Sequence, residues 1–174
     1  MNRIIFYSAI IWSLLIACGN TAKQPDQVAN TATEAQKSVS KNVLSMKING
    51  VEWVADHDVV GAFHPKGYNK LIMIAGKKGS KDKGEQFFNI NIYNTDGPGT
   101  YNFKHGNPDL SEAQMGNWSP ETFLCGSMMG FDMRVKATTA STKPDVIEAT
   151  FEGEMTCNSG EVFKITEGKF YYHE

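Results

Sequence analysis

The amino-acid sequence predicts an all-β domain, either an antiparallel β-sandwich or a barrel of about eight to ten short strands, with at most one short helix. Three observations support this fold class. Apolar and polar residues alternate in many short stretches, and turn-forming clusters of Gly, Asn or Pro separate these stretches. The composition also favours strands, with 10 Phe, 6 Tyr and 16 Gly among 174 residues.

Composition and charge exclude several classes of protein. Apolar residues make up 41% of the chain and charged residues 21%, which is ordinary for a globular protein. The formal net charge is −2, with 17 Lys and Arg against 19 Asp and Glu. This balance argues against a basic surface for nucleic acid and against a polybasic membrane patch. We therefore expect no nucleic-acid partner.

Residues 1–17 have the features of a signal peptide that is removed. Arg3 supplies a basic start, and the run from Ile4 to Ile16 is almost entirely apolar. Such a run of 13 residues would span about 20 Å as a helix, which is less than the ~30 Å hydrocarbon core of a bilayer. A cleaved signal therefore fits this segment better than a transmembrane helix does.

The segment that ends the apolar run, Leu15-Ile16-Ala17-Cys18 followed by Gly19, resembles the bacterial lipobox. In lipoproteins of that kind the signal peptide is cut before the cysteine, which is then acylated. The resemblance implies that Cys18 carries lipid and that the membrane is a partner through this lipid. Gly19 favours the outer membrane, with the protein facing the periplasm or the cell surface. An ordinary signal peptide with a chance cysteine is the alternative.

Residues 18–41 are expected to be the lipidated Cys18 and a flexible tether. The segment from Gly19 to Lys41 has no aromatic residue and is dominated by small and polar side chains, so it cannot bury enough surface to fold. Residues 42–174 then form a single β domain.

The domain opens with a predicted hairpin around Asn49-Gly50, the preferred sequence for a type I′ turn. Folding the chain about this turn places apolar side chains opposite one another on one face and a favourable charge pair on the other. The expected pairs are Leu44–Ala55, Met46–Trp53, Ile48–Val51 and Lys47–Glu52.

Five further segments of the domain show strand patterns, and a sixth, short one lies near its C-terminus. They cover residues 59–64, 69–77, 86–94, 100–104, 162–166 and about 170–172. Residues 71–75 are apolar on both faces, so this strand should be central. Residues 76–84 carry four lysines and are expected to be a solvated hairpin loop. A short helix is expected from Asn107 to about Gln114, because Asn, Pro and acidic residues stand where a helix would begin.

Alternation on both sides of Ser141 predicts a second hairpin. Folding the chain there pairs Phe131 with Phe151, Met133 with Ala149 and Val135 with Ile147. The same register places Cys125 opposite Cys157. Because Cys18 is assigned to lipid, these two remain as an even pair in an oxidising compartment, and we expect a disulfide. Two buried free thiols are the alternative.

Three motifs of the domain together resemble a family of small Bacteroidota-type lipoproteins whose all-β domain has no characterised function. The motifs are Ile48-Asn-Gly-Val-Glu-Trp53, Ile147-Glu-Ala-Thr-Phe-Glu-Gly153 and Ile165-Thr-Glu-Gly-Lys-Phe170. They are strand and turn signatures. The resemblance therefore implies the fold class and a location in the cell envelope, but it implies no activity.

The sequence contains no nucleophile elbow, P-loop or zinc-protease motif, so we expect a binding or interaction module that is not an enzyme. The expected site lies in the loop region 102–123, around His105 and Trp118, and the partner would be an envelope glycan, peptide or protein. The alternative for Trp118 is a structural role, in which it plugs one end of the sandwich. We expect no catalytic residue and no cofactor. We also expect no metal site, because His57 and His64 would point to opposite faces of a continuous strand. Clustered Met128, Met129 and Met133 are interpreted as core residues.

Two alternative functions stay open at this point. The domain could be a calycin-like barrel that carries a small apolar ligand, which would require strands closed around a cavity. It could also be a hydrolase, which would require a deep cleft lined by Asp56, His57 and Asp58.

Overall fold

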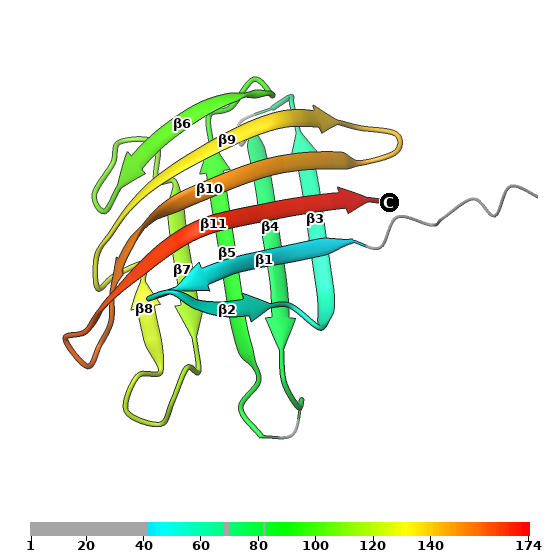
Figure 1. Ribbon diagram of the computed structural model, residues 1–174. Helices are drawn as coiled ribbons and strands as arrows, with labels where there is room; N and C mark the ends of the chain where they lie inside the picture. Colours follow the sequence, from blue (N-terminus) through cyan, green and yellow to red (C-terminus); the bar gives the residue numbers. More distant parts are fainter. Residues whose placement is uncertain (1–41, 68–69, 82) are drawn as a thin grey trace, which may run out of the picture. The chain divides into compact units, whose positions relative to one another are not determined.

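The structure is a computed structural model that describes residues 42–67, 70–81 and 83–174. The predicted signal peptide, Cys18 and the tether lie outside these residues. The described part contains eleven β-strands and no helix (Figure 1). The strands are β1 (Val43–Ile48), β2 (Val51–Val54), β3 (His57–His64), β4 (Leu71–Lys78), β5 (Gln86–Tyr93), β6 (Gly99–Lys104), β7 (Glu112–Gly116), β8 (Leu124–Gly126), β9 (Phe131–Ser141), β10 (Val146–Thr156) and β11 (Val162–His173). None of the residues described belongs to a helix able to cross a membrane.

The strands form two antiparallel sheets that pack face to face as a sandwich, with the strands of one sheet crossing those of the other (Figure 1). One sheet has the order β2-β1-β11-β10-β9-β6 and the other the order β3-β4-β5-β7-β8. Neither sheet closes on itself, so the predicted all-β class is confirmed as a sandwich and the barrel alternative is wrong. Aromatic side chains fill the space between the sheets, where the rings of Phe88 and Phe151 stack at 5.3 Å and Trp53 lies 6.3 Å from Phe88.

The first hairpin has the predicted register. Met46 pairs with Trp53, and both turn residues have positive φ, 50° at Asn49 and 82° at Gly50, as a type I′ turn requires. Lys47 stands opposite Glu52 as predicted, but its close ion pair is with a different carboxylate. The ammonium group of Lys47 lies 2.7 Å from the carboxylate of Glu167 on β11, because β1 lies between β2 and β11 and has a neighbour on each side.

The second hairpin exists, but its predicted register is wrong. Phe131 pairs with Met155 instead of Phe151, and Val135 pairs with Phe151 instead of Ile147. Side chains alternate with a period of two residues, so a shift of four residues leaves every apolar side chain on the same face. The alternation therefore fixes the faces of β9 and β10, but not which residues stand opposite one another.

The disulfide between Cys125 and Cys157 is present, although the register used to predict it is wrong. Cys125 lies on β8 in the five-stranded sheet, and Cys157 directly follows β10 in the six-stranded sheet. The chain turns between β8 and β9 through Gly126 and Gly130, which both have positive φ. The disulfide therefore links the two sheets.

The predicted helix at residues 107–114 is wrong. The side chain of Asn107 accepts a hydrogen bond from the backbone of Ser111 and donates to two backbone carbonyls, which stabilises a turn in place of a helix N-terminus. Strand β7 follows, with Ala113 and Met115 fully buried. Two short strands, β7 and β8, were missed, and residues 162–173 form one strand where two were predicted. The apolar segment 71–75 is central as expected, since β4 lies between β3 and β5.

Candidate functional site

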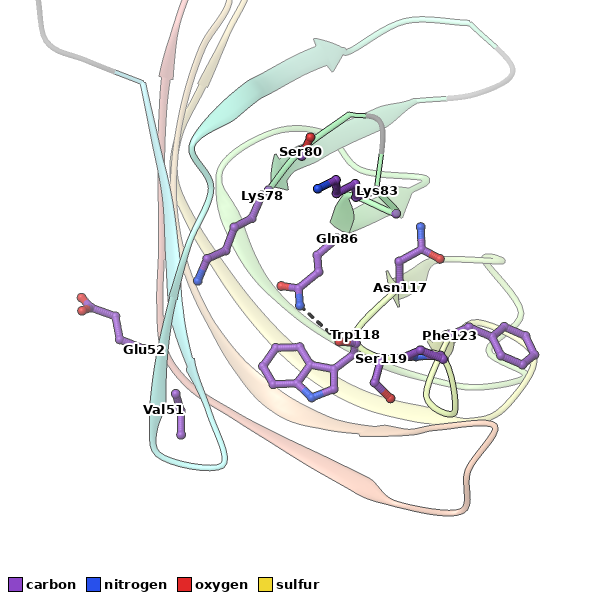
Figure 2. A pocket seen from close by; sticks show the side chains of 13 residues that line it. Val51, Glu52, Lys78, Ser80, Lys83, Gln86, Asn117, Trp118, Ser119 and Phe123 are labelled. Atoms are coloured by element: carbon purple, nitrogen blue, oxygen red, sulfur yellow. Dashed lines mark hydrogen bonds between the residues drawn. The ribbon is translucent and has the colours of Figure 1, made fainter.

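A pocket of about 570 Å³ opens at the end of the sandwich where the β1–β2 hairpin, the β4–β5 hairpin and the β7–β8 loop meet (Figure 2). We call it the Trp118 pocket. Its lining residues come from β2, from the β4–β5 segment and from the β7–β8 loop, and they are Val51, Glu52, Lys78, Gly79, Ser80, Lys83, Gly84, Gln86, Asn117, Trp118, Ser119, Pro120 and Phe123. Its volume falls within the usual range of small-molecule sites, roughly 300–1,000 Å³.

Trp118 is fixed in this pocket by its own loop and by the six-stranded sheet. The loop is closed by a hydrogen bond from the backbone N–H of Asn117 to the carbonyl of Phe123, at 2.9 Å. The indole meets the ring of Phe163 edge to face, with centroids 5.1 Å apart. The side chain is half-buried, and Figure 2 shows the indole reaching across the pocket toward β2. A flat aromatic surface is thus held ready to contact a ligand.

Gln86 connects the pocket to the core. The indole N–H of the fully buried Trp53 donates to Gln86 Oε1 at 2.8 Å, and Gln86 Nε2 donates to the backbone carbonyl of Trp118 at 3.4 Å. The first bond directs the amide oxygen toward the core and the amide nitrogen toward the β7–β8 loop. The position of the loop is therefore tied to the first strand pair of the core.

Two lysines give the pocket a positive rim. Lys78 and Lys83 both line it, and Glu52 is the one acidic residue among the described residues of its lining, with its side chain directed away from the indole in Figure 2. Phe123 adds an apolar surface and is 56% exposed. An aromatic platform beside ammonium groups and amides is suited to a ligand that has a flat or ring-shaped body and carries negative charge.

His105 lies in a different place from Trp118, so the structure does not bring the two predicted binding residues together. His105 follows β6, and its Nδ1 is 2.8 Å from the carbonyl oxygen of Ser127. It lines a separate, shallower pocket of about 320 Å³. Met128 lies beside it there and is 72% exposed, and Met129 is exposed as well, so the interpretation as core residues is wrong for these two and is confirmed only for the buried Met133.

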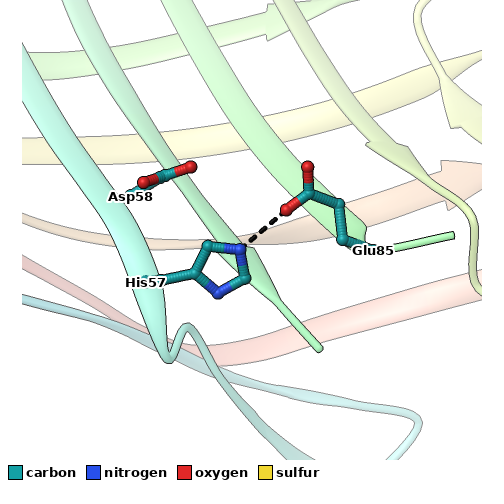
Figure 3. A group of neighbouring side chains, drawn as sticks. All are labelled: His57, Asp58 and Glu85. Carbon is teal, nitrogen blue, oxygen red and sulfur yellow. Dashed lines mark hydrogen bonds and ion pairs between the residues drawn. The ribbon is translucent and has the colours of Figure 1, made fainter. Parts of the chain in front are cut away.

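A second group of polar side chains lies on the outer face of the five-stranded sheet (Figure 3). The Nε2 atom of His57 is 2.7 Å from Glu85 Oε2, and its Nδ1 contacts the carboxylate of Asp56. The hydrogen bonds with Glu85 and then Asp56 raise the pKa of His57 above its ordinary value of 6.5. The bond from His57 lowers the pKa of Glu85 in turn, and the bond from Lys77 adds to the effect.

This group does not form the deep cleft that a hydrolase would require. The side chains of Asp56 and Asp58 are 57% and 43% exposed, and Lys77 occupies the space between Glu85 and Asp58. Sequence reasoning found His57 and its neighbours but missed Glu85. Only the pairing of β3 with β4, and of β4 with β5, brings this carboxylate to the histidine.

Sequence reasoning also missed Lys78 and Lys83, because the lysine-rich segment 76–84 was interpreted as a solvated loop, and it missed Gln86, because this residue was interpreted only as the first residue of a strand. No local pattern relates this segment to Trp118, which is more than thirty residues away along the chain.

Comparison with known proteins returns no match, whether against family models, curated proteins or solved structures. The function of the chain therefore has to be argued from the chemistry of its own sites.

Proposed function

We propose that this protein is a lipid-anchored binding protein of the cell envelope that recognises an acidic glycan in the Trp118 pocket. The observation that carries the proposal is the combination of a fixed, half-buried indole with Lys78 and Lys83 in one pocket of about 570 Å³. A sugar ring presents a flat C–H face that can pack on the indole, and its carboxylate can pair with the ammonium groups.

The anchor in this proposal is the lipid on Cys18. The tether from Gly19 to Lys41 would give a reach of roughly 25 Å for a flexible chain, so the domain could contact glycans beyond the lipid headgroups. Labelling with a palmitate analogue should mark the protein, and Cys18→Ser should abolish the label. Unchanged labelling of this variant would contradict the anchor but not the pocket.

The geometry favours this function over the two alternatives. A carrier of apolar ligands needs an open space between the sheets, whereas Trp53, Phe88 and Phe151 pack against one another there. A hydrolase needs its titratable groups in a cleft with the substrate, whereas His57 and its carboxylates lie on the outer sheet face.

The test is calorimetric titration of the full-length chain in detergent with a uronic-acid oligosaccharide and with the same oligosaccharide after reduction of its carboxyl groups. We expect the acidic form to bind at least about tenfold more tightly, which is about 1.4 kcal/mol. Trp118→Ala should weaken binding of both forms, and Lys83→Met should weaken only the acidic form.

His105→Ala is the matched control, because His105 lines the other pocket. It should leave the affinity unchanged. Equal binding of the acidic and reduced oligosaccharides would contradict the role of the lysines. If wild type and Trp118→Ala bind the glycan equally well, the binding site lies outside the Trp118 pocket. If His105→Ala alone weakens binding, the site is the smaller pocket.

A further inference from the structure

We propose that His57, Asp58 and Glu85 form a binding site for one divalent transition-metal ion, with Zn²⁺ as the best-fitting ion. The site is independent of the Trp118 pocket and lies on the outer face of the five-stranded sheet (Figure 3). One ligand atom from each residue lies within 4.8 Å of the other two.

The backbone of β3 is irregular where the ligands begin. Register shifts between His57 and Val60, and Asp58 has a φ of 49°. In a regular strand neighbouring side chains point to opposite faces, but the extra residue of the bulge places His57 opposite Lys77 on the outer face. His57 and Asp58, although adjacent in sequence, therefore both face Glu85.

The donor atoms are of the types that bind zinc, and the spacing of two of them is close to that in a zinc site. Imidazole nitrogen and carboxylate oxygen bind Zn²⁺ at about 2.0–2.2 Å, which places neighbouring ligand atoms of a tetrahedron roughly 3.3 Å apart. His57 Nε2 and Glu85 Oε2 are 2.7 Å apart, so they need to separate by only about half an ångström. The Lys77 ammonium group, 2.9 Å from Glu85 Oε1 and 3.5 Å from Asp58 Oδ2, would move aside, and the Asp58 oxygen would approach the other two ligand atoms from within 4.8 Å. The fourth position of the tetrahedron would then go to water.

Surrounding groups orient two of the three ligands. The carboxylate of Asp56 contacts His57 Nδ1 and also accepts the backbone N–H of Gly79 at 3.0 Å, so it holds the imidazole with Nε2 directed at the site. A carboxylate behind a metal-binding histidine is a common arrangement in zinc sites. Lys77 donates to Glu85 Oε1 at 2.9 Å, and Glu85 Oε2 is the oxygen that faces His57.

The cluster offers three carboxylates, and the surrounding cations balance their charge while His57 is protonated. Three carboxylates, those of Asp56, Asp58 and Glu85, lie around one imidazole. The cations that face them are Lys77, from β4, and the 68% exposed Lys81, which is 3.8 Å from Asp58. A divalent ion would replace the proton between His57 Nε2 and Glu85 Oε2 and release it to solvent. The other imidazole proton would stay on Nδ1, where it is donated to the carboxylate of Asp56.

The experiment uses the full-length chain with Cys18→Ser, without a histidine tag and stripped with EDTA, so that no free thiol competes for the ion. Calorimetric titration with ZnCl₂ should show one site. His57→Gln and Glu85→Gln should each weaken Zn²⁺ binding at least about 100-fold, and Asp56→Asn about 10- to 100-fold. Co²⁺ bound in place of zinc should give visible ligand-field absorption that is lost in His57→Gln.

His105→Gln and Glu112→Gln are the matched controls, because both side chains are away from the cluster, and they should bind Zn²⁺ as the parent chain does. Thermal melts of every variant establish that it folds. The proposal is overturned if the parent chain binds no Zn²⁺ at millimolar concentration, or if folded His57→Gln binds it as tightly as the parent. Titration of the same variants with the acidic oligosaccharide in EDTA tests the Trp118 pocket without metal, so a failure of the metal site can be distinguished from a failure of the glycan site.

Discussion

At the scale of single residues, the outer-face cluster depends on one backbone irregularity. In a regular strand the neighbouring side chains of His57 and Asp58 would point to opposite faces of the sheet. The bulge, at which Asp58 has a positive φ, turns His57 to the outer face as well. Asp tolerates the left-handed backbone conformation better than most residues, but an Asp in the sequence is not enough to predict a bulge. Trp118, by contrast, was singled out because it is an aromatic residue in a polar loop between strands, and the structure places it at a pocket; its role in binding stays a prediction.

The titration of His57 is a prediction at this scale, for the protein in EDTA. Hydrogen bonds with Glu85 and Asp56 favour the charged imidazole, so the pKa of His57 is raised above 6.5. A raised pKa in the folded state contributes stability that is fully present below the unfolded pKa, and this stability is lost as pH rises through the folded pKa. The stability advantage over His57→Gln should therefore shrink from about pH 6.5 upward. NMR titration of the imidazole checks the pKa, and a value at or below 6.5 would contradict the hydrogen-bond network.

At the scale of elements, the sequence predicts best where two independent signals agree. The first hairpin has both an Asn-Gly turn and matching alternation, and its register is correct. The β9–β10 hairpin has only alternation, and its connection is the four-residue segment 142–145, not a turn centred on Ser141. Strand β7 was taken for a helix because the same Asn107 can cap a helix or close a turn, and only pairing with β5 decides between them.

The first turn gives a prediction at this scale. Gly50 has a φ of 82°, and a Cβ there would meet no other atom within 4 Å, so any cost of substitution comes from the backbone conformation alone. Gly50→Val should lower the free energy of unfolding by about 1–3 kcal/mol, because a β-branched residue is strained at positive φ. Gly50→Asn is the control and should cost much less, since Asn tolerates this region. Urea unfolding measures both, and equal losses for the two variants would show that turn conformation does not decide the cost.

At the scale of the whole molecule, the two sheets are held together by the apolar core and by one covalent link. Cys125 and Cys157 are both almost fully buried, at 1% and 2% exposure. The disulfide joins the short edge strand β8 of the five-stranded sheet to the end of the long strand β10 of the six-stranded sheet. The pair was predicted from the even number of cysteines that remains once Cys18 is assigned to lipid, whereas its role between the sheets could not be derived without the topology.

Loss of this link gives the last prediction. The disulfide closes a loop with a sequence separation of 32 residues, for which loop entropy predicts a stabilisation of about 3–4 kcal/mol. Cys125→Ala/Cys157→Ala should therefore unfold at lower urea concentration than the oxidised parent. Reduction of the parent under native conditions should give a similar loss without creating a cavity. Because the bridge acts mainly on the unfolded chain, the reduced protein should keep its native near-ultraviolet circular dichroism below the transition. Equal stability of the oxidised parent and the double variant would show that core packing alone holds the two sheets together.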